Sequence, residues 1–107
     1  MSLLKSYIEC LKAGDASRMA SLFAQDAEFY DDVPVSRGRP PTILKGRDNI
    51  EAFFKQTFDQ GGLDVDNVAI NGNAMRYDIV VRDMPILALS VMKEENNQIK
   101  EYRVVGT

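Results

Sequence analysis

The fold class is decided by residues 74–92, which read AMRYDIVVRDMPILALSVM. Apolar and polar side chains alternate over residues 75–81, and this period of two predicts a strand with one buried face. Residues 86–92 are almost continuously apolar, which predicts a central strand covered on both faces. The Asn-Gly-Asn turn at residues 71–73 predicts that the first of these strands forms a hairpin with a strand over residues 63–70.

The first part of the chain has helical spacing instead. Apolar side chains recur over residues 3–11 with the period of an amphipathic helix, and Gly14 ends that helix. Asp15 can cap a second, shorter helix through its carboxylate. The apolar stripe of this second helix consists of Met19, Leu22 and Phe23. A third helix begins near residues 46–48 and carries the apolar residues Ile50, Phe53, Phe54 and Phe58.

A short strand and a long loop separate the second and third helices. From Asp26 onward the period becomes two, so that Ala27, Phe29 and Asp31 share one side of an extended segment. Three prolines and a glycine make Val33–Lys45 a loop. Loops of this length in a small domain are often rims or lids of a site.

The order of the elements predicts the architecture. After the third helix the chain contains four strands, of which the last, over residues 98–104, alternates again. The order helix, helix, strand, helix and then four strands excludes regular βαβ alternation, and it predicts an α+β fold with three N-terminal helices on one face of a curled antiparallel sheet. Such a sheet can leave an apolar cavity beneath its helices. At 107 residues we expect a single domain, residues 1–107.

Composition excludes several classes of function. The 13 basic and 16 acidic residues are scattered, with a net charge of −3, so no basic stripe is available for nucleic acid. Cys10 is the only cysteine and the chain has no histidine, which excludes an internal disulfide, a thiolate zinc site and histidine triads. We therefore expect no metal and no cofactor. Since no stretch resembles a signal peptide or a membrane span, we expect a soluble, cytoplasmic protein with no membrane partner.

Four stretches carry a resemblance to a known superfamily. Residues 7–15 (YIECLKAGD) and 22–31 (LFAQDAEFYD) are similar to the opening of nuclear-transport-factor-2-like domains, which include SnoaL-like polyketide cyclases and ketosteroid isomerases. Residues 45–54 (KGRDNIEAFF) resemble the third helix of these domains, and residues 98–104 (QIKEYRV) resemble their final strand. The stretches occur in the same order over nearly the whole chain. The resemblance implies a cone-shaped, cystatin-like α+β barrel with a pocket between helices and sheet, often dimerising through the outer face of the sheet.

Asp31 is the first candidate for chemistry. If Ala27 and Phe29 point into the core, the Asp31 carboxylate points toward the cavity, where apolar surroundings raise its pKa and suit it to act as a general base. The resemblance implies the same role, because the ketosteroid isomerases carry their base at the matching position. The alternative is that Asp31 and Asp32 simply end a strand before a turn.

Tyr7 is the second candidate. It stands eight residues before Asp15, the offset at which the isomerases place the tyrosine that donates to a developing oxyanion. The alternative is a tyrosine with its ring in the core and its hydroxyl satisfied. The second donor of the isomerases matches Leu89, and further hydroxyls of their tyrosine network match Phe23 and Phe54, so efficient steroid isomerisation is not predicted. The residues predicted to line the pocket are Phe23, Phe29, Phe54, Tyr77, Ile79, Leu87, Leu89, Val91, Tyr102 and Val104.

Two classes of function stay open. The first is a SnoaL-like enzyme, an isomerase, cyclase or dehydratase that acts on a small hydrophobic carbonyl compound, with Asp31 as base and Tyr7 as donor. The second is a noncatalytic module that binds a hydrophobic ligand or dimerises. In a third arrangement, side chains simply fill the cavity. A homodimer is expected, because a curled sheet with a half-apolar outer face usually finds a partner.

Overall fold

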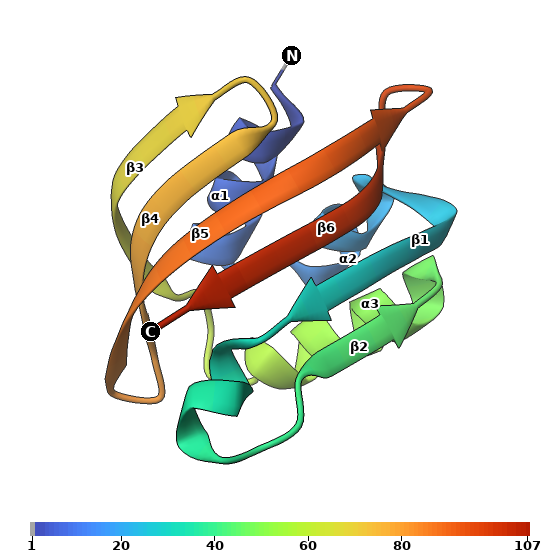
Figure 1. Ribbon diagram of the computed structural model, residues 1–107. Coiled ribbons are helices and arrows are strands. Elements are labelled where there is room, and N and C mark those ends of the chain that lie inside the picture. Colours follow the sequence, from blue (N-terminus) through green and yellow to red (C-terminus); the bar gives the residue numbers. More distant parts are fainter. Residues whose placement is uncertain (1) are drawn as a thin grey trace.

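The computed structural model describes residues 2–107, in which three α-helices pack on one face of a six-stranded sheet (Figure 1). The helices are α1 (Leu3–Ala13), α2 (Ala16–Ser21) and α3 (Arg47–Thr57), with a short 3-10 helix η1 (Val33–Arg37). The strands are β1 (Phe23–Asp31), β2 (Thr42–Lys45), β3 (Asp64–Asn71), β4 (Ala74–Val81), β5 (Met84–Glu95) and β6 (Gln98–Gly106). The predicted α+β class, with helices on a curled sheet, is confirmed.

Local sequence signals set the ends of the first two helices. The Ser2 side chain accepts a hydrogen bond from the backbone N–H of Lys5 at the start of α1. Gly14 ends α1 in the left-handed conformation with φ of 70°, which glycine adopts without the steric cost of a Cβ atom. The Asp15 carboxylate then caps α2 by accepting from the N–H of Arg18 at 3.0 Å, as predicted.

Strand β1 begins earlier than the sequence pattern indicates. Leu22 and Phe23 were predicted to belong to the second helix, but α2 ends at Ser21 and Phe23 is the first residue of β1. Tertiary contacts explain the difference. Phe23 pairs with Ile99 of β6, and the Arg47 guanidinium donates two hydrogen bonds to the Phe23 carbonyl at 2.9 and 2.8 Å.

The sheet has the order β2-β1-β6-β5-β4-β3 and is mixed rather than wholly antiparallel. The neighbours β1 and β6, which are far apart in the sequence, run parallel, and the other four pairs are antiparallel. Strand β2 was not predicted, because Val33–Lys45 was expected to be a loop throughout. Its four residues pair with the edge of β1, so the sheet contact and not the local pattern determines this strand.

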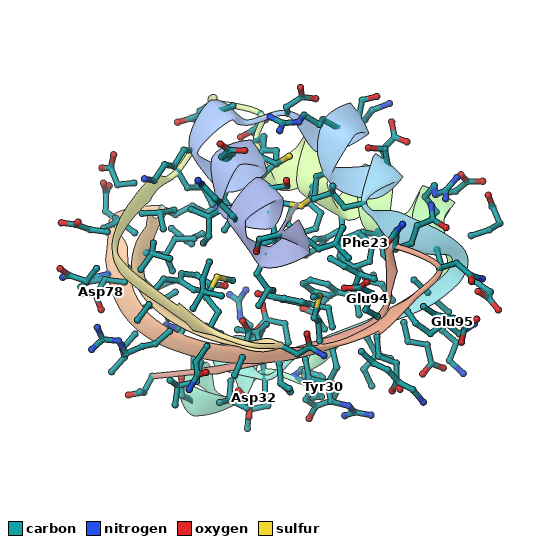
Figure 2. All side chains as sticks on the ribbon, turned by 90° about the horizontal axis from the view of Figure 1, so that it is seen from above. Phe23, Tyr30, Asp32, Asp78, Glu94 and Glu95 are labelled. Carbon is teal, nitrogen blue, oxygen red and sulfur yellow. The ribbon has the colours of Figure 1, made fainter. Side chains whose placement is uncertain are left out.

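The prediction that β5 is covered on both faces is wrong. The three helices lie on one side of the curved sheet only (Figure 2). Along β5 the side chains therefore alternate between buried and exposed, and Leu87, Leu89 and Val91 are 42%, 51% and 50% exposed. These three residues were predicted to line the pocket, but they lie on the outer face of the sheet, away from the helices. Burial alternates along β5 as in an ordinary strand, but the sequence does not show this because both faces carry apolar residues.

Candidate functional site

Aromatic side chains occupy the space between the helices and the inner face of the sheet. Tyr7 of α1 stacks on Tyr102 of β6 with ring centroids 4.5 Å apart, and Tyr102 stacks on Phe29 of β1 at 5.6 Å. Phe54 of α3 contacts Tyr7 and Phe29 edge to face. The other buried residues of the predicted lining are Phe23, Tyr77, Ile79 and Val104. The interior that the sequence predicts as a pocket is thus largely filled by its own lining.

Asp31 lies at one end of this core. Burial along the inner side of β1 is complete at Ala27 and Phe29 and partial at Asp31. The Asp31 Oδ1 atom accepts a hydrogen bond from the backbone N–H of Val33 at 2.8 Å. Burial raises the pKa of the Asp31 carboxyl; the Val33 hydrogen bond opposes this rise, and the Asp32 carboxylate adds to it. Asp31 therefore lies on the inner side of β1, and its carboxylate also accepts a hydrogen bond in the turn that follows. Its role as a base stays a prediction.

The neighbours of Asp31 on the strand point the other way. Figure 2 shows Tyr30 and Asp32 on the side of the sheet opposite the helices. Asp32 Oδ1 accepts from the backbone N–H of Gly106 at 3.2 Å, and the Tyr30 ring faces the Arg103 guanidinium at 5.3 Å. Of this acidic pair, Asp31 is the member on the inner face.

The side chains of Val33 and Ile86 lie beside this end of the core. A methyl group added at Gly106 would lie 2.5 Å from Val33 Cγ2 and 3.0 Å from Ile86 Cγ2, so Val33, Ile86 and the end of β6 are in close contact. Val33 and Asp31 are only partly buried. The core is therefore less completely buried at this end than at Ala27 and Phe29.

Tyr7 and Tyr77 lie within electrostatic reach of Asp31. Burial raises the pKa of the Tyr7 phenol well above its ordinary value, with further rises from Tyr77 and from the Asp31 carboxylate, and the Tyr102 hydroxyl opposes them. The pKa of Tyr77 is raised in the same way, by burial first and also by Asp31. These phenols stay protonated at neutral pH and can act only as neutral hydrogen-bond donors or acceptors.

Ser90 was not predicted as a site residue, yet it is one of two buried polar side chains among residues 2–107. Leu89, which matches the second donor of the isomerases, faces outward, so the inward position beside it is Ser90. The signal was available in the sequence, because Ser90 is the only polar residue in the apolar run 86–92.

Two hollows lie outside the aromatic core. One of about 240 Å³ is lined mainly by outward side chains of β1, β2 and β6, among them Tyr30, Ile43 and Arg103. The other, of about 360 Å³, lies between β2 and α3 beside Phe53. Neither is lined by Asp31 or Tyr7. Residues 2–107 contain no group of three or more histidine, cysteine, aspartate or glutamate side chains arranged to hold a metal ion.

Comparison with known families identifies the domain. The family of SnoaL-like domains matches residues 4–87, which is more than half of the chain. The chain belongs to the SnoaL-like domain family. The match confirms the resemblance found in the sequence of this SnoaL-like domain. Comparison with curated proteins gives no match.

Solved structures share the fold of this SnoaL-like domain at low sequence identity. A Catenulispora acidiphila protein with a ketosteroid isomerase-like fold, in complex with trimethylamine, is 12% identical with a TM-score of 0.71, covering 96% of this chain and 83% of that one. An NTF2-like protein of unknown function from Cytophaga hutchinsonii is 16% identical with a TM-score of 0.73, covering 98% and 87%. A Silicibacter pomeroyi protein with a cystatin-like fold is 19% identical with a TM-score of 0.71, covering 98% and 73%. At these identities the likeness establishes the fold alone.

Proposed function

We propose that this SnoaL-like domain is an enzyme that moves a proton on a small apolar carbonyl compound, as an isomerase, cyclase or dehydratase does. The observation that carries the proposal is the partly buried carboxylate of Asp31, with its raised pKa, on the inner face of the sheet beside buried phenols. A carboxylate in such surroundings is a stronger base than one in water. The proposed chemistry uses side chains alone.

The proposed step transfers one proton. The Asp31 carboxylate removes a proton from the carbon next to the carbonyl group, and the electron pair of that C–H bond forms the double bond of an enolate. The charge that develops on the oxygen is stabilised by a hydrogen bond from the Tyr7 hydroxyl. Return of the proton from Asp31 to the same or another carbon restores the carboxylate.

The test is the exchange of carbon-bound protons and needs no knowledge of the natural substrate. Cyclohexanone in D₂O loses its α-proton signals in the ¹H NMR spectrum when a base removes those protons. The wild-type protein should speed this loss, and Asp31→Asn should reduce the enhancement by about 10²- to 10⁴-fold. Asp32→Asn is the matched control, since Asp32 lies on the outer face. Equal rates for Asp31→Asn and wild type, or no enhancement by the wild type, contradict the proposal.

A second candidate function, a noncatalytic module that dimerises, is favoured by the outer face of the sheet. Leu87, Leu89 and Val91 of β5 lie beside Val105 of β6, which is 45% exposed and pairs with Leu89. We call these four residues the apolar strip. Contiguous exposed apolar side chains of this kind support contact with a second copy of the chain.

Sedimentation velocity tests the homodimer. The wild-type protein should sediment as a dimer, and Leu89→Glu should shift it to a monomer, because two charges would be buried at the contact. Val35→Glu is the control, since Val35 is also exposed but lies in η1. A monomeric wild type contradicts the dimer. A dimer that binds a hydrophobic ligand equally well with Asp31→Asn, and exchanges no protons, favours the noncatalytic module.

We further propose that residues 1–107 form one domain. The matched region ends at residue 87, but β6 lies beyond it and occupies the position between β1 and β5 in the sheet. The sheet is therefore incomplete without residues 88–107. Over residues 2–107 no helix has the length and hydrophobicity that crossing a bilayer requires. A cytoplasmic location remains a prediction, which fluorescence microscopy of the tagged protein in its own cell would test.

A further inference from the structure

Strand β2 forms one edge of the sheet, and only the side that faces β1 is paired (Figure 1). The backbone N–H of Gly46, directly after β2, donates to the Ala27 carbonyl of β1 at 2.8 Å. Bonded positions alternate along an antiparallel pair, so Leu44 also bonds to β1, whereas the backbone groups of Ile43 and Lys45 point away from it. The outer side of β2 therefore presents the backbone of these two residues, and we call it the free edge.

Most backbone groups of the free edge have no partner within the chain. The Asn49 side-chain amide of α3 donates to the Lys45 carbonyl at 2.8 Å. Within residues 2–107, no loop, cap or side chain bonds to the N–H or C=O of Ile43 or to the N–H of Lys45. These groups lie along one line, and such a line is a template for a further strand.

The two hollows described above border the free edge. Ile43 and Lys45 line the hollow of about 240 Å³ on the outer face of the sheet. They also line the hollow of about 360 Å³ between β2 and α3, together with Ala52 and Phe53. Successive side chains of a strand point to opposite faces. A strand added to β2 would therefore place its side chains alternately beside one hollow and the other.

The opposite edge of the sheet is irregular. Strand β3 shifts its register against β4 between Asp66 and Ala69, and Asn67 within this bulge has a φ of 53°. A bulge interrupts the line of backbone groups and makes an edge a poor template for another strand. Of the two edges, β2 is thus the one with a regular line of free groups.

The charge beside the free edge favours an acidic partner. Lys45 is the only charged residue in the lining of the hollow between β2 and α3, where Asn49 and Gln56 are polar but neutral. The Lys45 side chain is 78% exposed, and its Nζ atom lies 3.9 Å from the Glu28 carboxylate, which is a long ion pair. A carboxylate opposite Lys45 on an added strand would form a second, cross-strand pair with it.

We propose that β2 binds an extended segment of another protein as an additional antiparallel strand, and that this segment carries an acidic residue followed by an apolar one. In antiparallel pairing, one residue of the partner exchanges both backbone hydrogen bonds with Ile43. The acidic residue lies opposite Lys45. The apolar residue lies opposite Leu44, where its side chain enters the hollow beside Phe53. Neither Asp31 nor Tyr7 lines this surface, so the proposal is independent of the proposed enzymatic function.

The test uses the peptide acetyl-Thr-Glu-Leu-Thr-Val-Thr-amide, in which the glutamate, the leucine and the next threonine lie opposite Lys45, Leu44 and Ile43. Amide hydrogen exchange followed by NMR is the first measurement. In the free protein the Ile43 amide should exchange faster than the Leu44 amide, which bonds to β1. Bound peptide should slow the exchange of Ile43 about 10-fold and leave that of Leu44 unchanged.

Two N-methylated peptides supply the matched control. Methylation of the amide of the threonine opposite Ile43 removes a donor that points toward β2, so binding should be lost. Methylation of the leucine amide, which points away from β2, should preserve binding. The two peptides have the same composition and charge, so a difference between them reports strand pairing alone.

The role of charge is tested by exchanging it between protein and peptide. Lys45→Glu should weaken binding of the peptide about 3- to 10-fold, measured by fluorescence anisotropy of a labelled copy. The same variant should bind more tightly a peptide with lysine in place of the glutamate. Lys5→Glu is the control, because Lys5 is an exposed lysine of α1 and its substitution changes the net charge equally. It should leave both affinities unchanged.

Several outcomes would overturn the proposal. These are a wild type that binds no peptide at millimolar concentration, bound peptide that leaves the exchange of Ile43 unchanged, and equal binding of the two methylated peptides. Protection of the Ile43 amide that rises with protein concentration in the absence of peptide would show that β2 pairs with a second copy of the chain instead. Exchange of α-protons by the protein is a separate measurement and is unaffected by these results.

Discussion

The two faces of strand β5 differ in a way that its sequence conceals. The inner face carries Ile86, Ala88, Ser90 and Met92, of which the two middle residues are small, whereas the outer face carries Leu87, Leu89 and Val91, which are large and apolar. Small residues fit at the two middle inner positions because rings from α1, α3, β1 and β6 already fill that side. The outer positions have no such cover. Hydrophobicity along this strand therefore does not by itself show which side chains belong to the core.

The chemistry of the two faces differs as well. The inner face holds phenols and a hydroxyl that stay neutral, together with one carboxylate whose pKa is raised by burial. On the outer face, charged side chains flank the apolar strip: Arg76 pairs with Leu89, and Arg103 pairs with Val91. The inner face suits the recognition of a small polar group in apolar surroundings, and the outer face suits a protein contact with a charged rim.

The largest expected effect is on the free energy of unfolding, which should respond differently to substitutions on the inner and outer faces of β6. Tyr102→Ala should lower the free energy of unfolding by about 3–5 kcal/mol, because it removes a fully buried ring that contacts Tyr7, Phe23 and Phe29. Urea denaturation at low protein concentration measures the change. Val105→Ala, three residues further along β6 and on the outer face, should change it by no more than about 0.5 kcal/mol in the monomer. A loss as large for Val105→Ala as for Tyr102→Ala would contradict the exposed position of Val105 on the outer face.

A smaller effect on the free energy of unfolding is expected for Ser90→Ala. Its sign shows whether the Ser90 hydroxyl has a hydrogen-bond partner in the free protein. Ser90→Ala removes a hydroxyl that has no partner in the protein and should raise the free energy of unfolding by up to about 1 kcal/mol. Urea denaturation measures it, and Ser6→Ala, at the other buried serine, in α1, is the control. A loss of stability would indicate that an ordered water or an alternative rotamer satisfies the hydroxyl in the free protein.

The features that sequence predicts well here are those set by local residues. Gly14 and Asp15 end one helix and begin the next as expected, because capping depends on a few adjacent groups. The inward side of β1 follows from alternation alone, which places Asp31 with Ala27 and Phe29. The candidate acid was therefore available from the pattern, although its role stays a proposal.

The features that sequence misses depend on distant partners. Strand β2 exists through its pairing with β1, and the early start of β1 depends on Ile99 and Arg47, which lie far along the chain. A continuous apolar run cannot show which side of β5 meets the helices, so Leu87, Leu89 and Val91 were assigned to the pocket. The same ambiguity concealed Ser90. One residue of register on this strand separates the outer surface from the inner face.

The smallest expected effect is on how the free energy of unfolding depends on pH, and it differs between Asp31 on the inner face and the exposed Asp26. Since the pKa of Asp31 is raised in the folded state, the folded chain holds a proton at pH values where the unfolded chain, with an aspartate pKa of about 3.9, has released it. The free energy of unfolding of the wild type therefore falls as pH rises through the folded pKa. Asp31→Asn keeps an oxygen that can accept from Val33 and lacks this dependence, so it should be more stable than wild type at pH 7 and nearly equal to it below about pH 4.

Asp26 gives the opposite sign and serves as the control. Its carboxylate pairs with Lys100, and this hydrogen-bonded pair lowers the pKa of Asp26. The stability that it contributes is present above the unfolded pKa and is lost as pH falls, so Asp26→Asn should be the less stable protein at pH 7. Urea denaturation of both variants at several pH values measures the two differences, in which the other carboxylates cancel. If Asp31→Asn is destabilised by the same amount at every pH, Asp31 is no more desolvated than a surface acid. That result would contradict a raised pKa at Asp31 and the proposal that it is the base.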